Sequence, residues 1–430
     1  MRDYLVLSAI AAALPFILYR PWFGIIVWSW VGFMNPHKLG WGLAAHMPVA
    51  IAVGGVTLIA LLFTKDKKMI PMNGVMIILF LLALFFTFTT FFAWVPDAAW
   101  NKWEKVMKVL LMSFVIPMLI FGKFRIWCLM AVIVFSIGFY GFKGGIFSIV
   151  TGGHYKVWGP EASFIGGNTE IGLAMVMVLP LIIVLAREAE KKWLKNLLYI
   201  TFWLTVIATI FTYSRGALLG LAVVLALIFI SARRKVLIIG LLIPVVFIGF
   251  NFMPEKLIDR AKTIESYEQD NSAMQRIQAW SVALNVALDR PFTGAGFALD
   301  HAPDDLWVSY ASFLGDWNNR ARAAHSIYFS VLGEHGFIGL GLFLLLMIVT
   351  IVTLSRVKTI SLGQSDKAWA GHYADAIKIG IIGYAISGAF LSLAYFDLYY
   401  TYIALSAVLL REVQSHKVGS VEAKAIPIQG

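Results

Sequence analysis

The amino-acid sequence predicts an all-α, polytopic integral membrane protein, and three observations support this. Of its 430 residues, 60% are hydrophobic and 14% are charged, which leaves too little polar surface to cover a soluble domain. Apolar runs of about 20 residues, long enough to cross roughly 30 Å of hydrocarbon as helices, recur along the chain. Lysine and arginine cluster between these runs, as in cytoplasmic loops, so the net charge of +11 does not indicate nucleic-acid binding.

The apolar runs and the basic clusters together predict the topology. Two short runs, 4–18 and 22–34, come first. If they make a single crossing, the chain crosses about twelve times, and if both span, it crosses about thirteen times; we expect twelve. The longer runs are 45–63, 72–94, 104–121, 126–142, 168–186, 196–214, 216–232, 235–252, 325–355, 374–396 and 397–413. The basic clusters assigned to the cytoplasm are 64–70, 122–125, 187–196, 231–235 and 355–373.

The long polar segment 253–324 divides the chain and is expected on the side opposite the basic clusters. Residues 1–252 hold the first transmembrane helices, 325–413 the last ones, and 414–430 a cytoplasmic tail. Within the polar segment, an amphipathic pattern predicts a helix over 273–289, capped by Ser272 and closed by Pro291. After Gly294-Ala295-Gly296 we expect irregular chain up to the next span.

His325 opens the span that follows, in the pattern His325-Ser326-(nine residues)-Gly336-x-x-Gly339. We expect it on the first turn of a long helix, where the positive end of the helix dipole disfavours the imidazolium. A neutral imidazole at a wet membrane edge accepts a proton near pH 7, so His325 is a candidate general base. The alternative is an interfacial anchor or a cap. His335 is expected to be a packed, hydrogen-bonded histidine.

Two arginines are candidate phosphate ligands, because the planar guanidinium binds phosphate with two parallel hydrogen bonds. Arg215 lies in Tyr213-Ser214-Arg215-Gly216, at an external junction between two apolar runs, where positive charge is not favoured for orientation. Its alternative role is a snorkelling anchor. Arg276 lies one turn before Trp280 on the predicted amphipathic helix, and its alternative role is a solvated surface charge.

Further candidates are weaker. Lys143 lies beside glycines at an external span end, and Asn168 opens the next span, where a plain helix cap is the alternative. Glu170 enters an apolar helix and needs a partner or water. Loop arginines such as Arg322 are common. The sequence has no phosphate-binding loop, no His-Glu-x-x-His helix and no Gly-x-Ser-x-Gly elbow, so ATP-driven transport and metalloprotease activity are disfavoured.

Taken together, these motifs resemble the shared core of O-antigen ligases (the WaaL family) and O-antigen polymerases. The resemblance rests on the His325 pattern, on Arg276-x-x-x-Trp280 followed by Pro291-x-x-Gly294-x-Gly296, and on the Arg215 junction and Asn168. It covers roughly residues 160–345, and the N-terminal third resembles ligase-like proteins linked to exosortase-type systems. Ser326 is a departure, since many relatives have asparagine there.

The resemblance implies a GT-C-like glycosyltransferase of the bacterial inner membrane with a periplasmic active site. Its donor would be a glycan on undecaprenyl diphosphate, its acceptor a sugar hydroxyl of lipid A-core, and it would need no metal or cofactor. His325 would be the base, and Arg215 and Arg276 would stabilise the departing diphosphate in an inverting reaction. Contacts to substrate would come from Lys143, Asn168, Tyr213, Trp280, Arg322 and Ser326.

Three alternatives remain open. An O-antigen polymerase would extend a second carrier-linked glycan, and a protein O-oligosaccharyltransferase would modify Ser or Thr with the same donor. A polysaccharide or lipid transporter would place its polar residues near the bilayer midplane, in broken helices. In this sequence the polar candidates lie at external span ends, which favours chemistry at the membrane surface.

Overall fold

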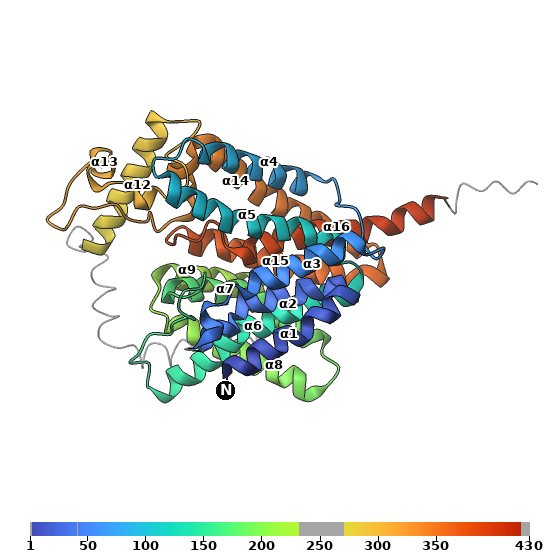
Figure 1. The fold of residues 1–430 in the computed structure, drawn as a ribbon. Helices are drawn as coiled ribbons and strands as arrows, with labels where there is room; N and C mark the ends of the chain where they lie inside the picture. Colours follow the sequence, from blue (N-terminus) through green and yellow to red (C-terminus); the bar gives the residue numbers. More distant parts are fainter. Residues whose placement is uncertain (1, 41, 232–270, 423–430) are drawn as a thin grey trace, which may run out of the picture.

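The computed structural model describes residues 2–40, 42–231 and 271–422, and within these ranges its secondary structure is entirely helical. The long helices lie side by side in one bundle, and the segment containing α12 and α13 projects from one end of it (Figure 1). The predicted run 235–252 and residues 253–270 of the polar segment lie outside the described residues. The prediction of an all-helical protein is confirmed for the described part of the chain.

The helices follow the apolar runs closely. In chain order they are α1 (Arg2–Tyr19), α2 (Pro21–Met34), α3 (Val49–Phe63), α4 (Gly74–Thr90), α5 (Pro96–Leu119), α6 (Gly122–Val150), α7 (Asn168–Glu188), α8 (Lys192–Ile210), α9 (Arg215–Ile230), α12 (Asn271–Asp289), α13 (Asp304–Ser309), α14 (Ile327–Leu362), α15 (Ala368–Gly388) and α16 (Asp397–Glu422). Short 3-10 turns, η1 (Pro36–Leu39), η2 (Leu43–His46), η4 (Leu299–His301) and η5 (Ser365–Lys367), join some of them.

Several helices have the length and composition of membrane spans. Among the described residues, α6, α7, α8 and α14 are long and apolar enough to cross a bilayer, and α1, α3, α4 and α9 are shorter apolar helices. α7 is apolar on nearly all sides because it packs against α6, α8, α9 and α15, and 83% of its most apolar stretch is buried. These helices support a multi-pass membrane protein.

The two short N-terminal runs form a hairpin, which differs from the single crossing expected for them. Arg20 makes the turn and Pro21 starts α2, since its restricted φ suits the first helical position. The Asp3 carboxylate, at the start of α1, touches Gly40 beyond the end of α2, where an added Cβ would lie 2.1 Å from its Oδ1. The chain therefore returns to the end of the bundle at which α1 begins.

The second helix of this hairpin runs parallel to α6. At one end the Trp22 ring packs edge-on against Phe124, with 5.9 Å between ring centroids. At the other end the Tyr140 hydroxyl donates a hydrogen bond to the Met34 carbonyl. The turn between α1 and α2 thus lies at the end that carries the basic cluster 122–125.

Segments that the sequence assigns to one side meet at one end of the bundle. At the end carrying the clusters 64–70 and 122–125, called the basic end below, Arg125 pairs with Asp66 at 2.5 Å. At the opposite end, the backbone N–H of Trp94 donates a hydrogen bond to the backbone carbonyl of Ala295 at 2.8 Å. This bond joins the α4–α5 turn to the polar segment. The Val157 N–H likewise donates to the Phe211 carbonyl at 3.0 Å.

The polar segment is more ordered than expected after Gly296. The amphipathic helix is present as α12, and the following chain, predicted to be irregular, contains η4 and the short helix α13. Asp304 and Asp305 occupy the first turn of α13, where carboxylates interact favourably with the helix dipole, and Trp307 of the same helix is buried. The last helix, α16, continues to Glu422, beyond the expected end of the span at 413.

Candidate active site

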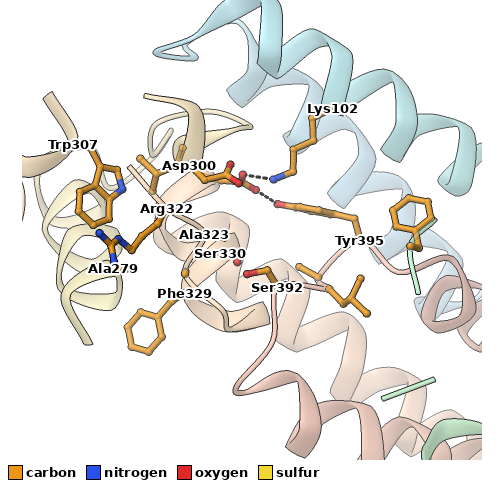
Figure 2. A pocket seen from close by; sticks show the side chains of 16 residues that line it. Lys102, Ala279, Asp300, Trp307, Arg322, Ala323, Phe329, Ser330, Ser392 and Tyr395 are labelled. Carbon is orange, nitrogen blue, oxygen red and sulfur yellow. Dashed lines mark hydrogen bonds and ion pairs between the residues drawn. The ribbon is translucent and has the colours of Figure 1, made fainter. Parts of the chain in front are cut away.

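A cavity lies at the end of the bundle opposite the basic end, where α5, α12, α14 and the loop before α16 meet (Figure 2). Its volume of about 140 Å³ is below the roughly 300 Å³ typical of pockets that enclose a whole small ligand, so it has room for only part of a large substrate. It is lined by Lys102, Phe164, Ala279, Leu299, Asp300, Trp307, Arg322, Ala323, Ala324, Phe329, Ser330, Glu334, Ser392, Leu393, Ala394 and Tyr395.

His325 stands at the edge of this cavity, just before α14. The expectation that it lies on the first helical turn is wrong, because its φ of +47° is left-handed and the helix begins at Ile327. Ser326 is the N-cap residue and is buried. The His325 N–H donates to Ser392 Oγ at 2.8 Å, which ties the turn to the loop before α16 and leaves the imidazole exposed.

The surroundings of His325 favour the neutral imidazole. Its pKa is lowered from the usual 6.5, first because neighbouring protein atoms displace water from the charged form and then because of the positive charge of Arg276. The carboxylates of Glu170 and Asp300 act in the opposite direction, and Arg322 adds a smaller lowering effect. The lowered pKa of His325 agrees in direction with the expectation, and desolvation is its largest cause.

Arg276 and Trp280 reach this region from α12. The Trp280 indole N–H donates to the Ala324 carbonyl at 2.7 Å, and its ring stacks on Phe329 with 5.0 Å between centroids. Trp280 was expected to contact substrate. In the structure the indole N–H of Trp280 is bonded to the backbone next to His325, so Trp280 positions the turn that contains His325.

Arg215 is the first residue of α9, and its neighbours build the turn that presents it. Ser214 caps the helix by accepting the Ala217 N–H at 3.2 Å. The Asn168 side chain donates to the Thr212 carbonyl at 2.7 Å. The Tyr213 hydroxyl donates to the carbonyl of Gly153, and Tyr213 itself has a left-handed φ of +57°. Asn168 and Tyr213, expected to bind substrate, therefore hold the Arg215 turn in place.

The start of α9 also abuts the loop that carries Ser392. A Cβ added at Gly216 would lie 3.0 Å from the Ser387 carbonyl, at the end of α15, so the two helices come into close contact there. Since Ser392 follows Ser387 by five residues and accepts the His325 N–H, the Arg215 turn and the His325 turn share a neighbouring element.

The other two predicted substrate contacts differ in location. Arg322 lines the cavity, and its guanidinium donates to the Asn318 carbonyl at 2.6 Å. Lys143 is exposed on α6 and is not among the lining residues. The glycines after it pack against α8, where a Cβ at Gly145 would lie 2.4 Å from the Leu204 carbonyl oxygen. These glycines thus permit helix packing rather than ligand approach.

The most buried carboxylate of the cavity, Glu334, was not predicted from the sequence as a site residue. Its side chain accepts hydrogen bonds from Lys102 Nζ at 2.5 Å and from the Tyr395 hydroxyl at 2.6 Å. Figure 2 shows Lys102 and Tyr395 pointing toward the same place, Lys102 from α5 and Tyr395 from the loop before α16. The Ala298 N–H also donates to it at 2.9 Å, and Glu334 is only 3% exposed. Glu334, like Glu170, is a carboxylate within an apolar run of the sequence, so the same argument would have singled it out.

His335 extends this network into the core. Its Nε2 lies 2.9 Å from the Tyr395 hydroxyl and its Nδ1 2.7 Å from Thr89 Oγ1. Since Tyr395 donates its proton to Glu334, the hydrogen-bond pattern assigns a proton to Nε2 and makes Nδ1 the acceptor. The ring stacks on Phe86 with 4.2 Å between centroids. His335 is thus buried and hydrogen-bonded, as predicted.

Glycines allow the polar segment to pack against α14 next to Glu334. α14 is broken at Gly336, which has φ +65° and ψ −167°, and the freed N–H of Phe337 donates to the Pro291 carbonyl at 3.0 Å. The Ala295 N–H donates to the Gly333 carbonyl at 2.9 Å. Gly294, with φ +59°, contacts the same turn. Gly294 and Gly336 therefore allow the backbone of the polar segment to approach the backbone of α14 closely.

Two protein families match parts of this chain. Residues 200–344 match the O-antigen ligase family. The chain carries an O-antigen ligase domain. Residues 1–190 match a second family, DUF5935, of unknown function. No curated protein matches the chain.

The O-antigen ligase domain runs from the middle of α8 through α9, α12 and α13 to the middle of α14. It therefore contains Arg215, Arg276, His325 and Glu334. Lys102 falls within the DUF5935 match, and Tyr395 lies beyond both matches, so the cavity is completed by residues from outside the ligase domain. Among the residues that the structure describes, no three His, Cys, Asp or Glu side chains are grouped as metal ligands.

Proposed function

We propose that this protein is a lipid-carrier-dependent glycosyltransferase that acts as an O-antigen ligase in lipopolysaccharide biosynthesis. It transfers a glycan from undecaprenyl diphosphate to a sugar hydroxyl of lipid A-core, at the periplasmic face of the bacterial inner membrane. The observation that carries the proposal is an exposed imidazole with a lowered pKa, His325, under the influence of Arg276 inside an O-antigen ligase domain.

The reaction is a single displacement at the anomeric carbon. The acceptor hydroxyl attacks that carbon while its bond to the phosphate oxygen breaks, and undecaprenyl diphosphate leaves with the bonding electron pair. His325 takes the proton of the attacking hydroxyl as general base, a role typically contributing about 10²–10⁴-fold in rate. Attack opposite the leaving group inverts the anomeric configuration.

In this mechanism arginine side chains provide the fixed positive charge. Arg215 and Arg276 bind the diphosphate and stabilise its growing negative charge, which preorganised donors do best where water is excluded. Arg322 contacts the substrate from the cavity wall. Asn168, Tyr213, Trp280 and Ser326 act by positioning the two turns. Lys143, which like Arg215 and Arg276 is not a lining residue of the cavity, is a further candidate substrate contact.

The pH dependence of transfer tests the base. We expect Glu170→Gln to move the acid limb of the pH–rate profile to lower pH. The sign follows because the Glu170 carboxylate raises the His325 pKa, so its removal lowers that pKa further and keeps the base neutral to lower pH. Glu161→Gln, an exposed carboxylate of the preceding loop, is the control and should leave the profile unchanged. An upward shift in the Glu170 variant would contradict the assignment.

The N-terminal hairpin bears on the number of crossings. With α2 parallel to α6 and the hairpin turn at the basic end, we propose thirteen crossings instead of twelve, with the start of α1 in the periplasm. In a Cys128→Ser background, a membrane-impermeant maleimide added to spheroplasts should label Tyr4→Cys and leave Lys65→Cys, in the basic loop, unlabelled. Labelling of neither variant would restore the twelve-crossing topology.

The acceptor separates the ligase from its relatives. A polymerase would elongate a second carrier-linked glycan, and a protein O-oligosaccharyltransferase would add mass to a periplasmic protein. Purified protein, radiolabelled carrier glycan and lipid A-core, with no nucleotide or metal added, should yield labelled lipopolysaccharide if the protein is a ligase. Label that stays on the carrier in longer chains indicates a polymerase. Absence of transfer to any acceptor would favour a transporter.

A further inference from the structure

The ionisable groups of the cavity wall balance one another. Two cations, Lys102 and Arg322, face two carboxylates, Asp300 and Glu334, and the remaining lining residues are uncharged at neutral pH. The positive charges that would attract a diphosphate, Arg276 and Arg215, are not among the lining residues. A wall with no net charge offers little attraction to a group that carries several negative charges.

The cations of the wall are also already engaged. Lys102 pairs with Glu334 at 2.5 Å, and the carboxylate of Asp300 adds to the field around its ammonium group. The guanidinium of Arg322 donates to the carbonyls of Asn318 and Arg320. A phosphate entering the cavity would have to compete with these partners and would also meet two carboxylates.

The rest of the wall matches a polyhydroxylated ring. Ser330 and Ser392 add hydroxyl groups to the charged donors and acceptors, so hydrogen bonds of both kinds are available around the cavity. The rings of Phe164, Trp307 and Phe329 add flat apolar surface. A sugar carries hydroxyl groups at its rim and C–H groups on its faces, which suits a wall of this composition.

We propose that this cavity is a subsite for an uncharged sugar ring and that the diphosphate binds outside it, beside Arg276 and His325. Lys102 and Asp300 contact the hydroxyl groups of the sugar, and Glu334 with Tyr395 holds the Lys102 ammonium in position. The proposal rests on the function proposed above and extends it by separating the sugar site from the phosphate site. The sugar comes either from the donor glycan or from the acceptor core.

Equilibrium binding to the full-length protein in lipid nanodiscs tests the subsite. The three probes are donor glycan released from its carrier by mild acid, lipid A-core, and undecaprenyl diphosphate without glycan. We expect Asp300→Asn to raise the Kd for one of the two sugar probes about tenfold, since it removes one charged acceptor, and to leave the Kd for glycan-free carrier within twofold. The probe that is affected identifies the source of the sugar.

Matched variants keep the test independent of folding. Asp305→Asn, an exposed carboxylate of α13 that does not line the cavity, should bind all three probes as the wild type does. Lys102→Arg keeps the charge opposite Glu334 but changes the shape of the donor, and it should weaken binding of the same sugar probe as Asp300→Asn. Melting temperatures of all variants are compared with that of the wild type.

The two proposals fail in different ways. If Asp300→Asn and Lys102→Arg bind both sugar probes normally, or if they lose affinity for glycan-free carrier to the same extent, the subsite is overturned. If the wild-type protein transfers no glycan from the carrier to any acceptor, the proposed function is overturned, whatever the binding results are.

Discussion

Replacing His325 with alanine is expected to reduce glycan transfer by about 10²–10⁴-fold, the usual contribution of a general base. The imidazole is exposed beside the cavity, and its lowered pKa keeps it neutral and ready to accept a proton. Its backbone N–H, which binds Ser392, is retained by alanine. The fold should therefore survive, and initial rates with radiolabelled carrier glycan measure the effect directly.

A second exposed histidine provides the control for this experiment. His301 lies on η4 of the same polar segment, where its Nδ1 is 3.3 Å from Asp300 Oδ1, and it does not line the cavity. His301→Ala should retain transfer within a few-fold of wild type. Near-normal transfer by a folded, membrane-inserted His325→Ala protein would remove the base from the mechanism.

Replacing Gly336 with alanine is expected to destabilise the protein by about 3 kcal/mol or more. Its φ of +65° and ψ of −167° belong to a region that is essentially restricted to glycine, at a cost of roughly 1–3 kcal/mol for other residues. An added Cβ would also lie 2.4 Å from the Pro291 carbonyl oxygen, so the polar segment would have to move away from α14. Thermal unfolding in detergent should show a lower melting temperature, with transfer reduced in parallel.

The control for this substitution lies on the same helix. Gly341 has no atom within 4 Å of an added Cβ, and alanine is the better helix former. Gly341→Ala should leave the melting temperature unchanged or slightly raised. Equal melting temperatures for Gly336→Ala and wild type would show that the break in α14 is not required for packing.

Local sequence patterns were sufficient to predict most of the described helices and to predict that the segments 64–70 and 122–125 lie at the same end of the bundle. The run 168–186 appears as α7 (Asn168–Glu188), and the amphipathic pattern over 273–289 appears as α12 (Asn271–Asp289). Both depend on the length and periodicity of apolar residues, which a chain displays without reference to its neighbours. The choice of His325, Arg215 and Arg276 as candidates came from motifs of the same local kind.

Local patterns failed where the backbone departs from regular geometry. The hairpin of α1 and α2 depends on where Asp3 packs against Gly40, and two short apolar runs are equally compatible with one bent crossing. The left-handed turn at His325 is set by its bond to Ser392, which lies 67 residues further along the chain. Neither contact can be predicted from the residues that are close to it in the sequence.

The sequence by itself determined an all-helical protein with membrane-spanning segments and the residue types of the proposed glycosyl-transfer site. Only the tertiary structure decided which side chains share the cavity. Lys102 and Glu334 are 232 positions apart, and Tyr395 is 61 beyond Glu334, yet the three form one network. Their pairing follows from the cost of burying an unpaired charge, which acts on neighbours in space and is met only once the helices have packed.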